Sequence, residues 1–139
     1  MSAKDIYHET VRHALIKDGW TITHDPFRLD IGEKRLSVDL GAERLISADK
    51  DVRRIVIEVK SFVGQSDVRD LELAIGQYIV YLKVLQKLGI ERQLYLAVSE
   101  ETFASIFESD LGRLFWEDHF VALIIFDDEQ EVITRWIPA

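Results

Sequence analysis

Hydrophobic residues recur every three or four positions in two segments of the chain, which is the spacing of one helix face. This pattern predicts a helix over residues 3–18, ended by Gly19, and a longer one over residues 66–88, ended by Gly89. Ser66 stands at the expected N-cap, where its side chain can accept a bond from a free backbone N–H. The apolar positions of the two stripes are Ile6, Val11, Ala14 and Leu15, and then Leu71, Ile75, Tyr78, Ile79, Leu82 and Leu85.

Shorter segments of alternating or continuous apolar residues predict strands. We expect them at residues 20–24, 36–40, 44–48, 54–60, 93–98, 120–126 and 131–137. A bend at Gly41 and a tight hairpin turn at residues 49–51 would connect the second, third and fourth of these segments. Residues 28–34 are polar and predict a loop, while residues 100–107 and 109–118 predict short helices. This order indicates an α/β fold with a mixed central sheet flanked by helices.

The length of 139 residues predicts one domain over residues 1–139 with a single core. No apolar run approaches the roughly 18–20 residues that a membrane span needs, so we expect no membrane association. The first residues lack the apolar segment of a secretory signal, and the chain has no cysteine. Together these features predict a cytoplasmic protein without a disulfide framework or a thiolate metal site.

The formal net charge is −8, and the acidic excess lies in the second part of the chain. Residues 1–60 carry 11 Lys and Arg against 11 Asp and Glu, while residues 61–139 carry 6 against 14. An acidic protein repels phosphate backbones at long range, which argues against tight, autonomous DNA binding. A local basic patch in the first part, or a basic partner that brings nucleic acid, remains open.

The most informative chemistry lies at the end of the strand predicted over residues 54–60, which closes with Glu58-Val59-Lys60. Glu58 and Lys60 are two apart and share one face of a strand, where burying either charge alone is costly. Asp39 on the preceding strand would add a second carboxylate. Such a group suits Mg²⁺- or Mn²⁺-dependent phosphodiester cleavage. Asp39, Glu58 and the carbonyl of Val59 would be the ligands, and Lys60 would lie near the attacking water.

The register of the hairpin decides which carboxylate faces Glu58. A two-residue turn at Asp49-Lys50 places Asp39 opposite Lys60 and one step from Glu58 on the same face. A shifted register instead places Glu43 opposite Glu58, so Glu43 is a second candidate ligand. The turn lacks the Asn-Gly signal that would specify one register. A structural ion-pair network at the strand end is the alternative to a metal site.

Asp39 followed by Glu58-Val59-Lys60 resembles the signature of the PD-(D/E)XK nuclease superfamily, with Val38 in place of the usual proline. The resemblance implies a restriction-endonuclease-like core and a supporting role for a glutamate on the first helix, which is Glu9 here. Gln77 and Tyr81 are one helical turn apart and resemble the Gln-x-x-x-Tyr motif of RecB-like members. The alternatives are a solvated helix residue for Glu9 and core packing for Tyr81.

Longer stretches are similar to the XisH family of cyanobacteria, which is named as an fdxN element excision controlling factor. They are residues 1–8, 38–43, 57–62 and 70–78. The resemblance implies a role in DNA recombination, namely excision of a DNA element by a site-specific recombinase beside a small XisI-like protein.

Three hypotheses follow. In the first, the chain is a metal-dependent endonuclease that acts on DNA directly or within a complex. In the second, it is a catalytically silent accessory protein that acts through the XisI-like partner or the recombinase. In the third, it is a nuclease toxin neutralised by its small partner. A homodimer is left open.

Overall fold

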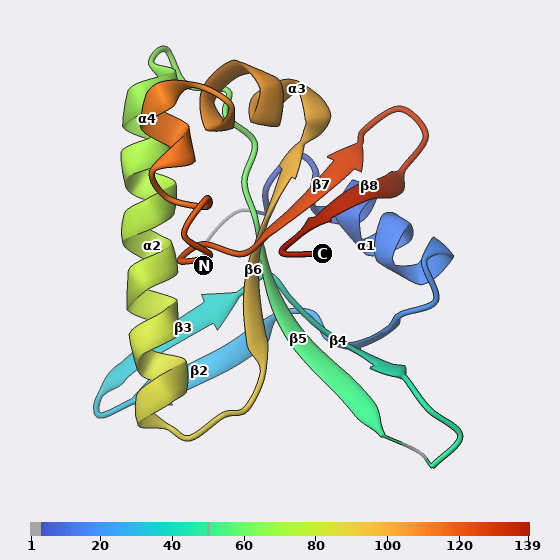
Figure 1. Cartoon of the computed structure of the whole chain (residues 1–139). Coiled ribbons are helices and arrows are strands. Elements are labelled where there is room, and N and C mark those ends of the chain that lie inside the picture. Colours follow the sequence, from blue (N-terminus) through green and yellow to red (C-terminus); the bar gives the residue numbers. More distant parts are fainter. Residues whose placement is uncertain (1–3, 50) are drawn as a thin grey trace.

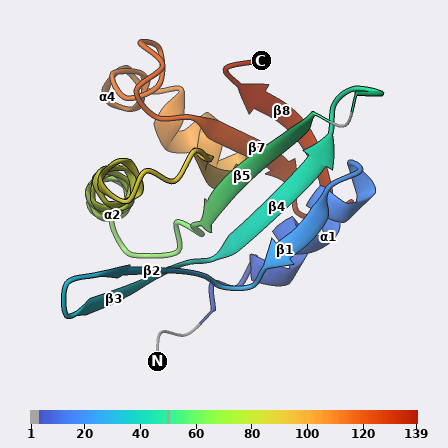
Figure 2. The ribbon, with the colours of Figure 1, turned by 90° about the horizontal axis from the view of Figure 1, so that it is seen from below.

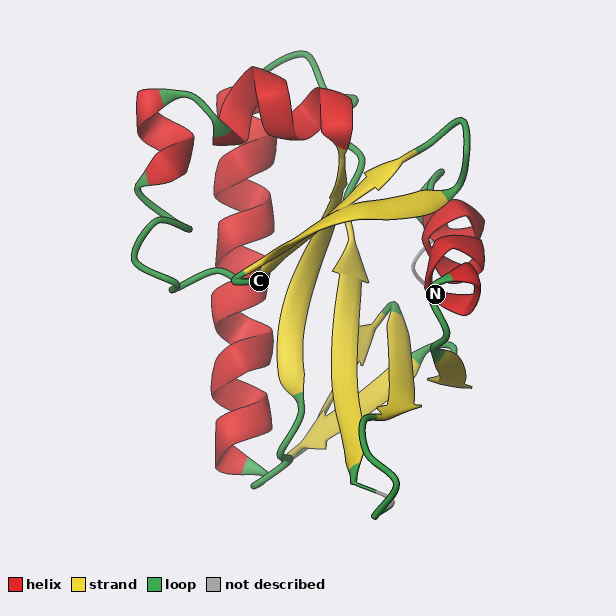
Figure 3. Cartoon of the chain, turned by 45° about the vertical axis from the view of Figure 1, so that its right-hand side comes forward, coloured by secondary structure: helices red, strands yellow, loops and turns green. Residues whose placement is uncertain are grey.

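The structure is a computed structural model, and it describes residues 4–49 and 51–139. Its centre is a six-stranded sheet in the order β1-β4-β5-β6-β7-β8, with α2 on one face and α1 on the other (Figures 1 and 3). A separate two-stranded hairpin, β2-β3, lies beside the lower half of α2 (Figure 1). The helices are α1 (His8–Lys17), α2 (Asp67–Lys87), α3 (Glu100–Thr102), the π-helix η1 (Phe103–Phe107) and α4 (Asp110–Arg113). The strands are β1 (Thr21–His24), β2 (Phe27–Ile31), β3 (Lys34–Val38), β4 (Leu40–Leu45), β5 (Val52–Val59), β6 (Gln93–Ser99), β7 (Leu123–Asp127) and β8 (Val132–Ile137).

The sheet is mixed, as the order of elements predicts. Strands β5, β6 and β7 run parallel, while β4 pairs antiparallel with both β1 and β5, and β8 pairs antiparallel with β7. The parallel step from β5 to β6 is made through α2, which is the crossover helix that such a pair requires. The predicted mixed α/β fold with flanking helices is therefore confirmed.

Strand β5 divides the core into two layers because its side chains alternate between the faces of the sheet. Val56 packs into the cluster beneath α2, whereas Ile55, Ile57 and Val59 pack into the cluster beneath α1. By the same alternation Glu58 points toward the α2 side. The apolar run that predicted this strand thus contributes side chains to both hydrophobic layers of the core.

The long helix begins where the sequence predicts. The hydroxyl of Ser66 accepts a hydrogen bond from the backbone N–H of Arg69 at 3.2 Å and caps α2. Helix α1 is shorter than predicted, because it begins at His8 rather than residue 3, which lies outside the described residues. In the part of the chain that the structure describes, no helix is long and apolar enough to cross a membrane.

The loop predicted over residues 28–34 is wrong, because these residues form most of the β2-β3 hairpin. Phe27 and Leu29 point into the core, while Arg28 and Asp30 are exposed. The strand is hard to recognise from the sequence because only a few inward apolar positions alternate with charged outward ones. Gly32, with a φ of 57°, supplies the turn. Figure 2 shows the hairpin extending away from the sheet.

The predicted bend at Gly41 is also wrong, since the break between β3 and β4 falls at Asp39. Gly41 lies inside β4, where an added Cβ would come within 2.8 Å of the Phe27 ring. The turn after β4 is longer than predicted, because β4 ends at Leu45 and β5 begins at Val52. The observed register pairs Leu40 with Ile57, and its continuation sets Asp39 opposite Glu58 instead of Lys60.

Candidate metal centre

A polar cavity of about 160 Å³ lies between the end of β5 and the middle of α2. Its lining residues come from four separate segments of the chain. They are Asp5, Ser37, Asp39, Glu58, Val59, Lys60, Gln77 and Tyr81. Six of the eight candidate site residues named from the sequence thus surround one space, and the structure leaves Glu9 and Glu43 outside it.

Asp39 and Glu58 are held opposite each other by reciprocal backbone contacts. The backbone N–H of Asp39 donates to Glu58 Oε1 at 3.3 Å, and the backbone N–H of Val59 donates to Asp39 Oδ2 at 2.7 Å. This arrangement exists because the strand breaks at Asp39, which frees its N–H from the sheet. The side chain of Val59 is buried beneath α1, so Val59 lines the cavity with its backbone.

The cavity holds more negative than positive charge. The Glu58 side chain is only 9% exposed, and its nearest cation, Lys60 Nζ, lies 4.0 Å from Oε2. Burial, and then the neighbouring Asp39, raises the pKa of Glu58 to about 9, while Lys60 acts in the opposite direction. Burial, followed by the charges of Glu58 and Asp39, raises the pKa of Tyr81 to about 12. Lys60 alone therefore does not neutralise the site.

These residues fit a hard divalent cation. Mg²⁺ takes oxygen ligands and is held by one or two carboxylates while it keeps several waters. Asp39 and Glu58 supply the carboxylates and the Val59 backbone lines the cavity beside them. A bound cation would offset the burial and the neighbouring Asp39 charge that disfavour the ionised form of Glu58. Mn²⁺ accepts the same donors.

Asp5 is a third carboxylate at the cavity that sequence reasoning missed. Its Oδ2 accepts hydrogen bonds from the backbone N–H of Ser61 at 2.8 Å and from the Ser61 hydroxyl at 2.9 Å. These bonds tie the segment before α1 to the residue after Lys60. No local pattern marks this contact, because it joins positions 56 residues apart.

Glu9 and Glu43 are engaged elsewhere. The Glu9 side chain is 56% exposed, and its Oε1 lies 3.7 Å from Lys4 Nζ. The residue that α1 turns inward at this point is its neighbour His8. Glu43 lies 3.4 Å from Arg54, its partner across β4 and β5.

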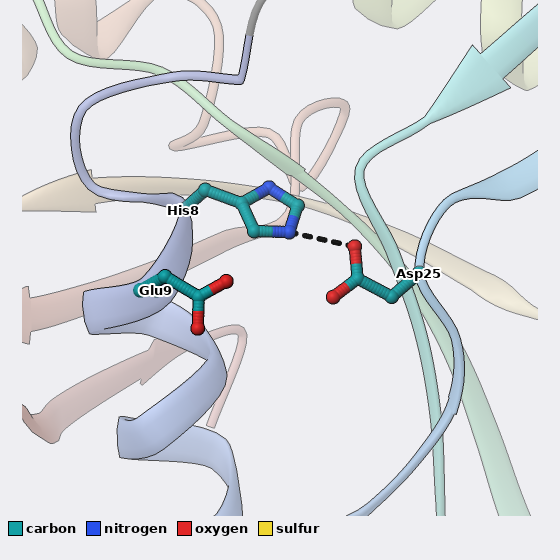
Figure 4. Close-up of side chains that lie close together, drawn as sticks. All are labelled: His8, Glu9 and Asp25. Carbon is teal, nitrogen blue, oxygen red and sulfur yellow. Dashed lines mark hydrogen bonds and ion pairs between the residues drawn. The ribbon is translucent and has the colours of Figure 1, made fainter.

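Glu9 belongs to a second group of possible ligands with His8 and Asp25 (Figure 4). His8 Nε2 lies 2.7 Å from Asp25 Oδ1, and Arg12 Nε lies 3.4 Å from Asp25 Oδ2. Since the guanidinium of Arg12 already supplies a positive charge to this group, the cavity around Asp39 and Glu58 is the better cation site.

Comparison with known proteins places the chain in a family. The family model described as XisH protein matches residues 1–134. The chain belongs to the XisH family. All eight lining residues of the cavity fall within the part that matches this XisH model.

Two crystal structures are similar over nearly the whole chain. One is an XisH family protein from Nostoc punctiforme PCC 73102, with 38% identity and a TM-score of 0.84 over 96% of this chain and 99% of that one. The other is an fdxN element excision controlling factor protein from Anabaena variabilis, with 38% identity, a TM-score of 0.84 and the same coverage. A search of curated proteins finds no match. The XisH resemblance seen in the sequence is thus confirmed.

Proposed function

We propose that this XisH-family chain is a divalent-metal-dependent phosphodiester hydrolase that acts on DNA, built on a restriction-endonuclease-like PD-(D/E)XK core. One observation carries the proposal: Asp39 at the β3-β4 break and Glu58 and Lys60 at the end of β5 meet at a single cavity. A nearly buried carboxylate beside a partly buried one, with one partial counter-charge, is costly for the fold, so a purely structural role explains this pair poorly.

A bound Mg²⁺ or Mn²⁺ would activate water and stabilise charge on the phosphate. Asp39 and Glu58 present the oxygens that hold such an ion, and their reciprocal backbone bonds keep them in place. Lys60, 28% exposed, can reach the water or the developing negative charge. Gln77 and Tyr81, from α2, form the opposite wall and can orient the phosphate.

The names of the relatives suggest the biological setting. One relative is named as an fdxN element excision controlling factor protein. We extend this to a role for the present chain in excising a DNA element. The proposed partners are DNA, a site-specific recombinase and a small XisI-like protein.

The test is cleavage of supercoiled, linear and branched DNA by the purified protein with Mg²⁺, Mn²⁺ or EDTA. Asp39→Ala and Lys60→Ala should each lower the rate at least about 100-fold, because they remove a metal ligand and a charge stabiliser. The matched controls Asp49→Ala and Lys87→Ala change exposed residues that do not line the cavity and should cleave like the wild type. Metal-dependent cleavage that survives in both site variants would reject the assignment.

A second candidate function is that of an accessory protein on the same fold. A largely apolar groove of about 470 Å³ lies next to the cavity, and Leu36, Leu73, Gly76 and Val80 line it together with Glu72, Gln77 and Tyr81. Such a groove, with the acidic second part of the chain, suits a protein partner better than DNA. Excision that proceeds normally with Lys60→Ala would favour this function over the hydrolase.

A further inference from the structure

The buried histidine of α1 lies between two carboxylates. His8 is only 3% exposed, and its Nε2 lies 2.7 Å from Asp25 Oδ1. Its other ring nitrogen, Nδ1, is buried, has no hydrogen-bond partner among the described residues and lies 3.9 Å from Asp39 Oδ1. A buried polar atom without a partner costs free energy, which calls for an explanation of this one.

The ring cannot turn freely. Asp25 Oδ1 lies 2.7 Å from Nε2 (Figure 4), and the Arg12 guanidinium forms an ion pair with the other oxygen of Asp25, with Nε at 3.4 Å. The ring therefore presents Nδ1 to Asp39 from a fixed direction. Figure 4 shows the imidazole extending from α1 toward Asp25.

The Asp39 carboxylate has its two oxygens in different surroundings. Oδ2 accepts the Val59 N–H at 2.7 Å, whereas Oδ1 is the oxygen nearest His8. With protons on both ring nitrogens, Nε2 donates to Asp25, and a movement of about 1 Å would bring Nδ1 from 3.9 Å into hydrogen-bond distance of Asp39 Oδ1. Bonds on both oxygens would then define how this carboxylate faces the cavity.

We infer that His8, locked by Asp25, is a positioning residue that orients the Asp39 carboxylate for cation binding. The inference rests on the proposed role of Asp39 as a metal ligand. It assigns to His8 the support that the sequence resemblance implies for Glu9, which lies one residue further on and does not line the cavity. Partners behind a ligand typically change metal affinity about 10–100-fold when they are removed.

The test measures Mn²⁺ affinity by calorimetry on the full chain, without any cleavage assay. His8→Gln and Asp25→Asn should each raise the Kd about 10–100-fold. The matched control is His13→Gln on the same helix, where His13 is 47% exposed and pairs with Glu131 at 3.2 Å; its Kd should equal that of the wild type. Melting curves without metal identify variants that fold. Affinities within twofold of the wild type in both His8→Gln and Asp25→Asn would overturn the inference.

A metal-free readout separates positioning from a general structural role. In ¹⁵N spectra of the histidine rings, Asp39→Asn should shift the Nδ1 resonance of His8, while the exposed Asp49→Asn should leave it unchanged. An unshifted Nδ1 would overturn the inference even if His8→Gln fails to fold. Wild-type protein that binds no Mn²⁺ would overturn both the metal site and this role. Binding that is lost in His8→Gln, without any DNA cleavage, would support positioning and count against the hydrolase alone.

Discussion

At the scale of single residues, Glu58 occupies an unfavourable position for an ionisable group. It occupies the end of an apolar strand, is nearly buried and faces a second carboxylate. Its folded-state pKa of about 9 lies far above the ordinary value of 4.5. Between pH 4.5 and about pH 9, the Glu58 carboxyl is therefore protonated in the folded protein but ionised in the unfolded chain.

This difference predicts the pH dependence of stability. Because the raised pKa favours the protonated form in the folded state, the contribution of Glu58 is fully present below about pH 4.5 and is lost as the pH rises toward 9. Glu58→Gln mimics the protonated form, so it should flatten this decline and raise stability at pH 8 by on the order of 2 kcal/mol. Urea unfolding in EDTA at pH 5, 7 and 9 measures this effect. The exposed Glu91→Gln serves as the control, and parallel pH profiles for Glu58→Gln and the wild type would contradict the prediction.

At the scale of elements, two glycines in helical segments have opposite surroundings. An added Cβ at Gly112 in α4 would lie 2.0 Å from the carbonyl oxygen of Ile106 and 2.5 Å from Cα of Phe107. Both atoms belong to the backbone of η1, so relief requires moving that segment. Gly76 in α2 is exposed and has nothing within 4 Å of such a Cβ.

Gly112→Ala should therefore destabilise the fold by about 3 kcal/mol, the range typical of overpacking. Gly76→Ala, made as its control, should stabilise α2 by up to about 1 kcal/mol, because alanine is the better helix former. Thermal unfolding of the two variants measures both effects. A Gly112→Ala protein as stable as the wild type would show that η1 and α4 do not pack as described.

At the scale of the whole molecule, the cavity joins parts that are distant along the chain. The segment before α1, the β3-β4 break, the end of β5 and the middle of α2 all contribute to it. A cation that binds there binds only the folded state, so it should stabilise the whole fold by mass action.

Mg²⁺ at 100 times its Kd should add about 2.7 kcal/mol to the free energy of unfolding and raise the Tm accordingly. Asp39→Ala should abolish this gain. Glu9→Gln should keep it, because Glu9 lies outside the cavity. Differential scanning fluorimetry across a Mg²⁺ series tests both variants. Loss of the gain in Glu9→Gln would restore the metal-assisting role that the sequence resemblance implies.

Much of the fold follows from local patterns. The apolar stripe and the Ser66 cap define α2 because helix spacing and capping act within a few residues. The run Ile55-Val56-Ile57 followed by Glu58 and Lys60 marked both the central strand and its unusual end. Strand β2 escaped detection because its inward positions are few and its outer face is charged.

The sequence by itself determined the helices, most strands, the family and the chemical identity of Asp39, Glu58 and Lys60. Only the tertiary structure decided that Asp39 faces Glu58, because a weakly specified turn leaves the register to cross-strand packing. It also decided that Asp5 and His8, not Glu9 or Glu43, lie next to these residues. Those contacts join distant positions through single side chains, and no periodic pattern along the chain records such a pairing.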